Sequence, residues 1–309
     1  MGLNMKNAVL LAKAEVTPGV DAVPDGATNA MLVQNLSINP LEQEVVQRNL
    51  IRPYFGNDEQ IPVGTKLSLS FEVEAAGAGT AGDAPAYAEL LKACGLAETI
   101  TVGTDVRYAP VSSGFGSLTM IYNLDGVSHK CTYGRGSVEL AFDAKGIPKF
   151  KFNFVALYAD VVDATVLSVD YSAFIKPLAV NKRNTPTASL HSNNIVLQSI
   201  SMDAGMNVAY QNLVGYEGVD LTDRAAKGKI LFQYTKVATY DWFGAIKNGD
   251  SGPLSFVHGV TAGNIVELAA PNVQIINPSI SDQDGTAMLG LDLNYNPVDG
   301  NDEFEIIVR

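Results

Sequence analysis

The three histidines are the first candidates for catalysis or metal binding, and their spacing argues against both roles. His129, His191 and His258 lie far apart in the sequence, and none belongs to an HxH or HxxxH pattern. A metal site or a catalytic base needs partner groups close by. We therefore interpret His129 and His258 as polar residues of strands, and His191 as a residue of a linker.

Carboxylates are plentiful, but no catalytic pattern accompanies them. The chain has no GxSxG elbow and no glycosidase-like or protease-like motif. Residues 282–285, Asp-Gln-Asp-Gly, match the start of a calcium loop but lack its closing glutamate, so we interpret them as a turn. The Gly/Ala-rich residues 75–83 lack the GxxxxGK[ST] pattern of a phosphate loop. We predict no enzyme, no metal and no cofactor.

The two cysteines, Cys94 and Cys131, are isolated and form no CxxC pair. Free, buried thiols are the preferred interpretation over a disulfide or a metal site. Free thiols fit synthesis in a reducing compartment.

The charge and hydropathy of the chain exclude further classes. Its 309 residues are 47% hydrophobic and 17% charged, with a net charge of −12. Such an acidic chain is a poor DNA-binding protein, although an acidic wall would let DNA slide past without sticking. The apolar residues 8–12 are too short for a signal sequence, and no run approaches the ~20 apolar residues of a membrane helix. We expect a soluble protein that stays in the cytosol until assembly.

The elements that position these residues show an internal repeat. Three blocks of the first half return in the same order in the second half: residues 32–38, 48–50 and 66–71 match residues 196–202, 211–213 and 229–234. Three more pairs continue the match: a helical patch (87–95 and 240–249), a turn (143–146 and 282–285) and a strand (150–154 and 289–293). A repeat of this length predicts a duplicated domain.

We therefore predict a mainly β chain of two tandem, similar domains, each with one short flanking helix. The predicted parts are an N-terminal arm without a core element (1–29), a first β domain (30–160), a linker (161–189) and a second β domain (190–309). The clearest strand is residues 66–74, because Leu67, Leu69 and Phe71 alternate with polar residues. The run from Leu32 is expected to stop at Asn39-Pro40, and residues 41–51 can form another strand. The segments 41–63 and 204–227 are expected to be long loops.

Residues 19–95 resemble the major tail tube protein family of long-tailed, non-contractile bacteriophages. The resemblance covers about the first third of the chain and depends on Thr-Pro-Gly-Val-Asp-Ala-Val-Pro at 17–24, Asn-Ala-Met-Leu-Val at 29–33, Ile-Asn-Pro-Leu-Glu at 38–42, Arg-Pro-Tyr-Phe-Gly at 52–56, Phe-Glu-Val-Glu-Ala-Ala-Gly-Ala-Gly-Thr-Ala-Gly at 71–82 and the helical residues 84–95.

The resemblance implies a β-sandwich or half-barrel fold for each domain. It also implies a structural protein of the siphophage virion tail, without catalytic residues. Copies join edge to edge in rings, the rings stack into a tube, and genomic DNA passes through the lumen during ejection. The implied partners are further copies, the tape measure protein, and the tail tip and tail terminator proteins. Single-domain members form rings of six, so we predict rings of three chains with six similar domains.

Two groups of residues are our candidates for contacts in this tube. The strands 64–74 and 227–236 are predicted to line the lumen, with Lys66, Glu72, Glu74, Lys229 and Lys236 facing DNA. The N-terminal arm and the two long loops are predicted to join ring to ring, through Arg52, Tyr54, Phe55, Asp58, Glu59, Asp220, Asp223 and Arg224. The alternative to the lumen assignment is a solvated strand face.

Other functions remain open at this point. One is a different structural phage part, a tail terminator or a capsid decoration protein. Another is a two-domain β-sandwich module that binds carbohydrate through Tyr54, Phe55 and Tyr216. An enzyme is the third alternative.

Overall fold

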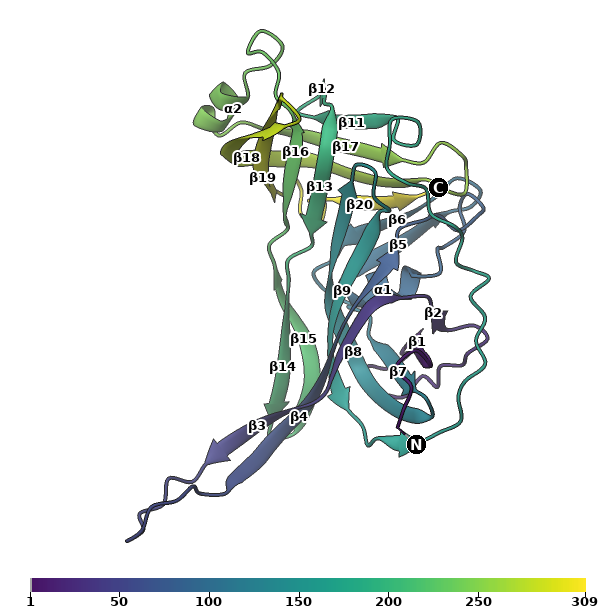
Figure 1. Cartoon of the computed structure of the whole chain (residues 1–309), viewed down its shortest axis with the longest axis vertical. Coiled ribbons are helices and arrows are strands. Elements are labelled where there is room, and N and C mark those ends of the chain that lie inside the picture. Colours follow the sequence, from purple (N-terminus) through teal and green to yellow (C-terminus); the bar gives the residue numbers. More distant parts are fainter. Residues whose placement is uncertain (1) are drawn as a thin grey trace.

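The computed structural model describes residues 2–309, which form an elongated, antiparallel β structure with two short helices (Figure 1). The first half comprises β1 (Ala8–Ala14), β2 (Ala30–Met31), β3 (Gln34–Gln47), β4 (Gln60–Glu74), α1 (Ala88–Ala93), β5 (Leu96–Thr101), β6 (Asp105–Pro110), β7 (Leu118–Leu124), β8 (Val127–Asp143), β9 (Lys149–Tyr158) and β10 (Val162–Asp163).

The second half comprises β11 (Thr187–Leu190), β12 (Asn193–Asn194), β13 (Leu197–Asp203), β14 (Met206–Leu213), β15 (Tyr216–Arg224), β16 (Lys227–Gln233), α2 (Trp242–Asn248), β17 (Ser251–His258), β18 (Val266–Gln283), β19 (Thr286–Tyr295) and β20 (Glu305–Val308). The prediction of a mainly β chain with one short helix in each half is confirmed. Neither helix in the described part of the chain is long and apolar enough to cross a membrane.

Four strands of the first half pair in the order β3, β4, β9, β8. Alternation along β4 buries Leu67, Leu69 and Phe71 on one face. Phe71 meets β9 in the core, where its ring centroid lies 5.7 Å from that of Phe152. The predicted strand at residues 66–74 is therefore confirmed as part of β4.

The second half repeats this order of pairing with β13, β16, β19 and β18. Its helix α2 starts at Asp241, whose side chain accepts a hydrogen bond from the Gly244 amide at 2.9 Å. Trp242 follows directly and is buried against Phe232 of β16.

The two sets join through β8 and β13, where Leu140 pairs with Met202 and Ala141 with Ser201. The result is one continuous succession β3-β4-β9-β8-β13-β16-β19-β18, called the long sheet below. The last strand, β20, also bridges the halves, because it pairs with β18 on one side and with β6 on the other. A single cluster of buried apolar residues accordingly runs through both halves. Residues 164–186, within the predicted linker, contain no helix or strand.

The N-terminal arm contains a core element, contrary to the prediction. β1 pairs with β7 along its full length, and Leu10, Leu11 and Ala12 are buried. The apolar run that is too short for a signal sequence is long enough for a strand, because a strand needs only about five residues.

Both predicted long loops are largely β-hairpins, and the strand allowed for residues 41–51 is present as the outer part of β3, to Gln47. β3 continues through Asn39-Pro40 to Gln47, with a shift of register between Asn39 and Glu42. Proline is tolerated there because it lies at a bulge on an outer strand, where no ladder hydrogen bond is lost. Residues 204–227 form the hairpin β14–β15 rather than a loop.

Candidate assembly surfaces

One face of the long sheet is polar across its width. Residues directly opposite each other in neighbouring strands lie on the same face. One row on this face runs through Glu72, Lys151, Glu139, Asp203, Lys227 and Asn294. The next row runs through Glu74, Lys149, Ala141, Ser201, Lys229 and Asp292.

Four of the five predicted lumen residues lie on this polar face: Lys66, Glu72, Glu74 and Lys229. Lys236 does not, because β16 ends at Gln233 and Lys236 lies in the turn before α2. The predicted strand at residues 227–236 was too long at its end. Even in a longer strand, Lys236 would lie on the other face, because it is seven positions from Lys229.

Opposite charges are neighbours on the polar face. The Glu72 carboxylate accepts hydrogen bonds from Lys149 Nζ at 2.8 Å and from Asn35 Nδ2 at 2.9 Å. The bond from Lys149 holds the pKa of the Glu72 carboxyl below its ordinary value. Lysines 66, 149, 151, 227 and 229 share the face with Glu42, Glu72, Glu74, Glu139, Asp143, Asp203 and Asp292. Most of the net charge of −12 therefore lies on other surfaces.

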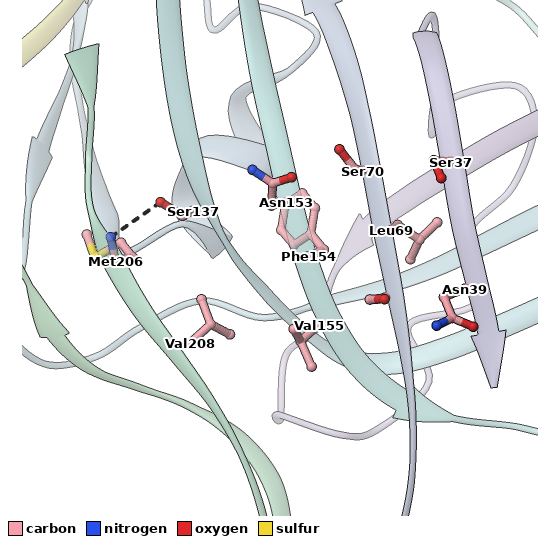
Figure 2. A pocket seen from close by; sticks show the side chains of 11 residues that line it. Ser37, Asn39, Leu69, Ser70, Ser137, Asn153, Phe154, Val155, Met206 and Val208 are labelled. Atoms are coloured by element: carbon pink, nitrogen blue, oxygen red, sulfur yellow. Dashed lines mark hydrogen bonds between the residues drawn. The ribbon is translucent and has the colours of Figure 1, made fainter. Parts of the chain in front are cut away.

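The hairpin β14–β15 of the second half crosses the polar face of the first half. The Met206 amide donates to Ser137 Oγ at 3.3 Å, and Met206 and Val208 lie across a cavity of about 450 Å³ from β8, β9 and β4 (Figure 2). The sheet side of this cavity is lined by small polar residues, Ser37, Ser68, Ser70 and Asn153 among them.

Arg135 of β8 fixes this hairpin. Its Nη1 donates to the Val219 carbonyl of β15 at 2.9 Å, and its other nitrogens donate to the carbonyls of Phe115 and Gly116. Its guanidinium lies 4.9 Å from the centroid of the Tyr133 ring. Tyr133 in turn shares a hydrogen bond of 3.2 Å with the Tyr216 hydroxyl.

A smaller cavity of about 270 Å³ lies close to the corresponding place in the second half, where Lys229 and Asp292 are the counterparts of Ser70 and Asn153. Its lining comes only from β13, β16, β18 and β19, and includes Ser199, Lys229, Asn277 and Asp292. In contrast to the cavity in Figure 2, it has no contribution from a hairpin.

Both ends of the long sheet present backbone without a pairing partner in the described chain. β3 pairs only with β4. At the other end, residues 275–283 of β18 pair only with β19, since β17 and β20 pair with earlier residues of β18. Ile280 lies on this free edge and is 61% exposed. A free edge of this kind attracts other strands unless it is covered.

The β3–β4 hairpin projects well beyond the rest of the chain (Figure 1). Its tip, residues 48–59, contains an ion pair between Arg52 and Asp58, and Asp58 also accepts a hydrogen bond from the Leu50 amide at 2.9 Å. The apolar side chains of Leu50, Ile51, Tyr54 and Phe55 are exposed. Of the predicted ring-to-ring residues, Arg52, Tyr54, Phe55, Asp58 and Glu59 are therefore brought together at this tip.

Asp220, Asp223 and Arg224 lie instead on β15, apart from the tip. Arg224 is nearly buried, and its guanidinium donates to Glu303 at 2.7 Å, to the Val111 carbonyl at 2.9 Å and to Asn301 at 3.1 Å. Asp220 accepts a hydrogen bond of 2.9 Å from Tyr216. The bonds of Arg224 are thus satisfied within the chain.

Two of the three histidines make hydrogen bonds to the backbone within the fold. His191 binds the Val273 carbonyl through Nε2 at 2.8 Å, and His258 binds the Leu178 carbonyl through Nε2 at 3.0 Å. Cys94 and Cys131 are free and buried, as predicted. Within residues 2–309, no group of three His, Cys, Asp or Glu side chains is arranged to hold a metal ion.

Sequence reasoning missed Ile280 and Arg135. Ile280 lies in a polar stretch, Ser279-Ile280-Ser281, just before a turn that the repeat had already matched to residues 143–146. That match aligns Ile280 with Ala141, next to the buried Leu140, and was a usable signal. Arg135 had no such signal, because its partners Phe115 and Val219 are remote in the sequence.

Comparison with known proteins gives one family. The sequence model of a family described as phage tail tube protein matches residues 5–297, nearly the whole chain. No curated protein matches the chain.

Proposed function

The chain belongs to the phage tail tube protein family, whose members are structural components of the virion tail, and we propose that it polymerises as stacked rings that form the tail tube of a non-contractile phage. The observation that carries the proposal is the long sheet, which presents a free edge at each end. Two complementary free edges can pair head to tail, and they form a ring when the rotation from copy to copy closes. Closure removes every free edge.

We further propose that three chains close one ring. The order of pairing in β3, β4, β9 and β8 repeats in β13, β16, β19 and β18. This repeat supports two tandem tube domains, in residues 30–160 and 190–309. Three chains then supply the six domains that single-domain members of the family supply with six chains.

The part of the polar face that the hairpins leave uncovered is our proposed lumen surface. Glu72 and Glu74 are our candidates there, whereas Lys66 lies against Tyr210 of β14 and Lys229 lines the second-half cavity. The lysines of the polar face offset most of its carboxylates. A face with mixed charges neither attracts the DNA backbone strongly nor repels it strongly, because attraction requires an excess of cations. Genomic DNA would pass over such a surface without specific binding and without a catalytic step.

The projecting tip of the β3–β4 hairpin is our proposed ring-to-ring contact. Its exposed apolar residues are costly to leave in water and would be buried against the next ring. Asp220 and Asp223 are weaker candidates, since they lie on a hairpin that already packs on its own chain. The tape measure, tail tip and tail terminator proteins remain the proposed partners, with assembly in the host cytoplasm.

Electron microscopy of the purified protein tests this function. Wild-type protein is expected to form tubes. A variant in which residues 49–58 are replaced by Asn-Gly should form rings that do not stack, because the sheet edges are intact and the tip is gone. A wild-type protein that stays monomeric when concentrated, with tail-tip proteins added, would contradict the proposal.

A further inference from the structure

We propose that the free edge of β18 pairs with the free edge of β3 of a second copy, in the register that β8 and β13 use within one chain. The pairing presupposes the proposed ring and names the surface that closes it. The β8–β13 pairing between the two halves of one chain is thus the model for the β18–β3 pairing between two chains.

The β3 side of the register follows from matched strand pairs. Phe71 pairs with Phe152 in the first half, and Ile230 pairs with Leu291 at the same place in the second half. With these pairs matched, Ser37 opposite Ser70 corresponds to Ser201 opposite Lys229. Ser37 therefore has the position on β3 that Ser201 has on β13.

The β18 side follows in the same way. Ala141 opposite Lys149 corresponds to Ser281 opposite Met288. Inside the chain Ala141 pairs with Ser201, so Ser281 is expected opposite Ser37 of the second copy. All four residues are small, and none is charged, so neither bulk nor like charge opposes the pairing.

The burial of the neighbouring residues supports this register. Leu140 and Met202, which pair next to Ala141 and Ser201, are both 0% exposed. Their counterparts are Ile280, which is 61% exposed, and Ile38, which is half-buried. Pairing of the two edges would bring Ile280 opposite Ile38 and bury both side chains, as pairing within the chain buries Leu140 and Met202.

The hairpins provide a second, independent observation. β14–β15 continues from β13 and lies over the first-half cavity, where Val219 is fully buried and Met206 and Val208 face the sheet. The outer part of β3–β4 continues from β3 in the same way, but Val45, Val46, Ile61 and Val63 on it are exposed.

In the proposed pair, the outer hairpin of the second copy would lie over the second-half cavity of the first copy. Within the described chain, no hairpin lines that cavity. The same partner thus covers the free edge, Ile280 and the cavity at once. A second copy fits all three features because its hairpin continues from β3, the strand that would pair with β18, as β14–β15 continues from β13, the strand that pairs with β8.

Disulfide cross-linking tests the register. Ser37→Cys and Ser281→Cys are placed together in one chain, and the protein is oxidised mildly and run on a non-reducing gel. Opposed residues in neighbouring strands are close enough for a disulfide. A ladder of linked chains ending at the ring size is expected. The wild-type Cys94 and Cys131 are buried and should not contribute.

Two matched pairs serve as controls. Ala141→Cys with Ser201→Cys is the internal equivalent, and it should link within one chain. Asn39→Cys with Ser281→Cys shifts the register by two residues, because Asn39 pairs with Ser68 and Ser37 with Ser70. The shift of about 7 Å is too far for a disulfide, and this pair should not link.

The outcomes separate this inference from the proposed function. If microscopy shows rings and the internal control links, but Ser37→Cys with Ser281→Cys does not, the ring stands and the edge pairing is refuted. If neither rings nor links between chains form, both fail.

A single substitution gives a second test. Ile280→Lys should leave the melting temperature of the monomer unchanged, because the side chain is exposed there, and should weaken ring association about tenfold or more. Val298→Lys, at an equally exposed site of 61%, is the matched control and should assemble normally. Normal assembly of Ile280→Lys would overturn the proposal.

Discussion

Replacement of Arg224 by methionine is expected to destabilise the isolated chain strongly. The guanidinium of Arg224 joins β15 to Glu303 at 2.7 Å and to the Val111 carbonyl at 2.9 Å. The side chains of Arg224 and Glu303 are only 10% and 12% exposed. Without the arginine, the Glu303 carboxylate stays nearly buried but has lost its cation. The β14–β15 hairpin also loses its link to the segment before β20.

The size of the effect follows from this burial. Removal of one partner from a buried ion pair costs about 3–5 kcal/mol. The slight exposure of both side chains lets water reach them, so we expect the lower end, about 3 kcal/mol. With a urea dependence of about 3 kcal/mol per molar, the unfolding midpoint should fall by about 1 M. Fluorescence of Trp242, the single and buried tryptophan, reports the transition.

Two further variants make the test specific. Arg224→Met with Glu303→Leu should recover most of the lost stability, because a buried apolar pair can replace a buried ion pair at little cost. Arg52→Met removes the more exposed ion pair with Asp58 at the hairpin tip and should change the midpoint little. If Arg224→Met shifts the midpoint no more than Arg52→Met does, Arg224 does not hold the β14–β15 hairpin to its own chain. The prediction that Arg224 contacts the next ring would then be favoured again.

Three other outcomes are expected. Phe152→Ala should cost about 3–5 kcal/mol in urea unfolding, since its ring lies 5.7 Å from Phe71 and 5.9 Å from Phe154; a cost below 1 kcal/mol would contradict the core. The pKa of Glu72 is lowered in the folded chain by Lys149, so its stabilisation is present above the ordinary value of about 4.3 and disappears as the pH falls through the lower folded value. Between about pH 5 and 3, the melting temperature of wild type should thus fall more than that of Glu72→Gln; equal slopes would refute the pairing. Burial raises the pKa of the Cys131 thiol to about 12, so a thiol reagent near neutral pH should modify the protein only after denaturation, and rapid labelling of native protein would count against the packing.

The parts of the fold that depend on local pattern could be predicted from the sequence. The alternation of Leu67, Leu69 and Phe71 with polar residues fixed both the strand and its buried face. The helix α2 was readable from its apolar residues and from the glycine that ends it, Gly249.

Features that depend on long-range pairing could not be predicted. The hairpin β14–β15 was expected as a loop because Gly205, Gly215 and Gly218 interrupt its pattern, and its burial comes from β8, far away in the sequence. The ion pair of Arg224 joins residues 79 positions apart. Lys236 was placed on the polar face with Lys229, although the two are seven positions apart and alternation would put them on opposite faces. The end of β16 could not be predicted, because only the neighbouring strand shows where the pairing stops.

The number of chains in one ring tests the central claim most directly. It can be counted in end-on electron micrographs of purified tubes and checked by the native mass of a single ring. Three chains with six similar domains are predicted, because each chain supplies two sets of four strands. A ring of six whole chains would contradict the claim that one chain supplies two tube domains.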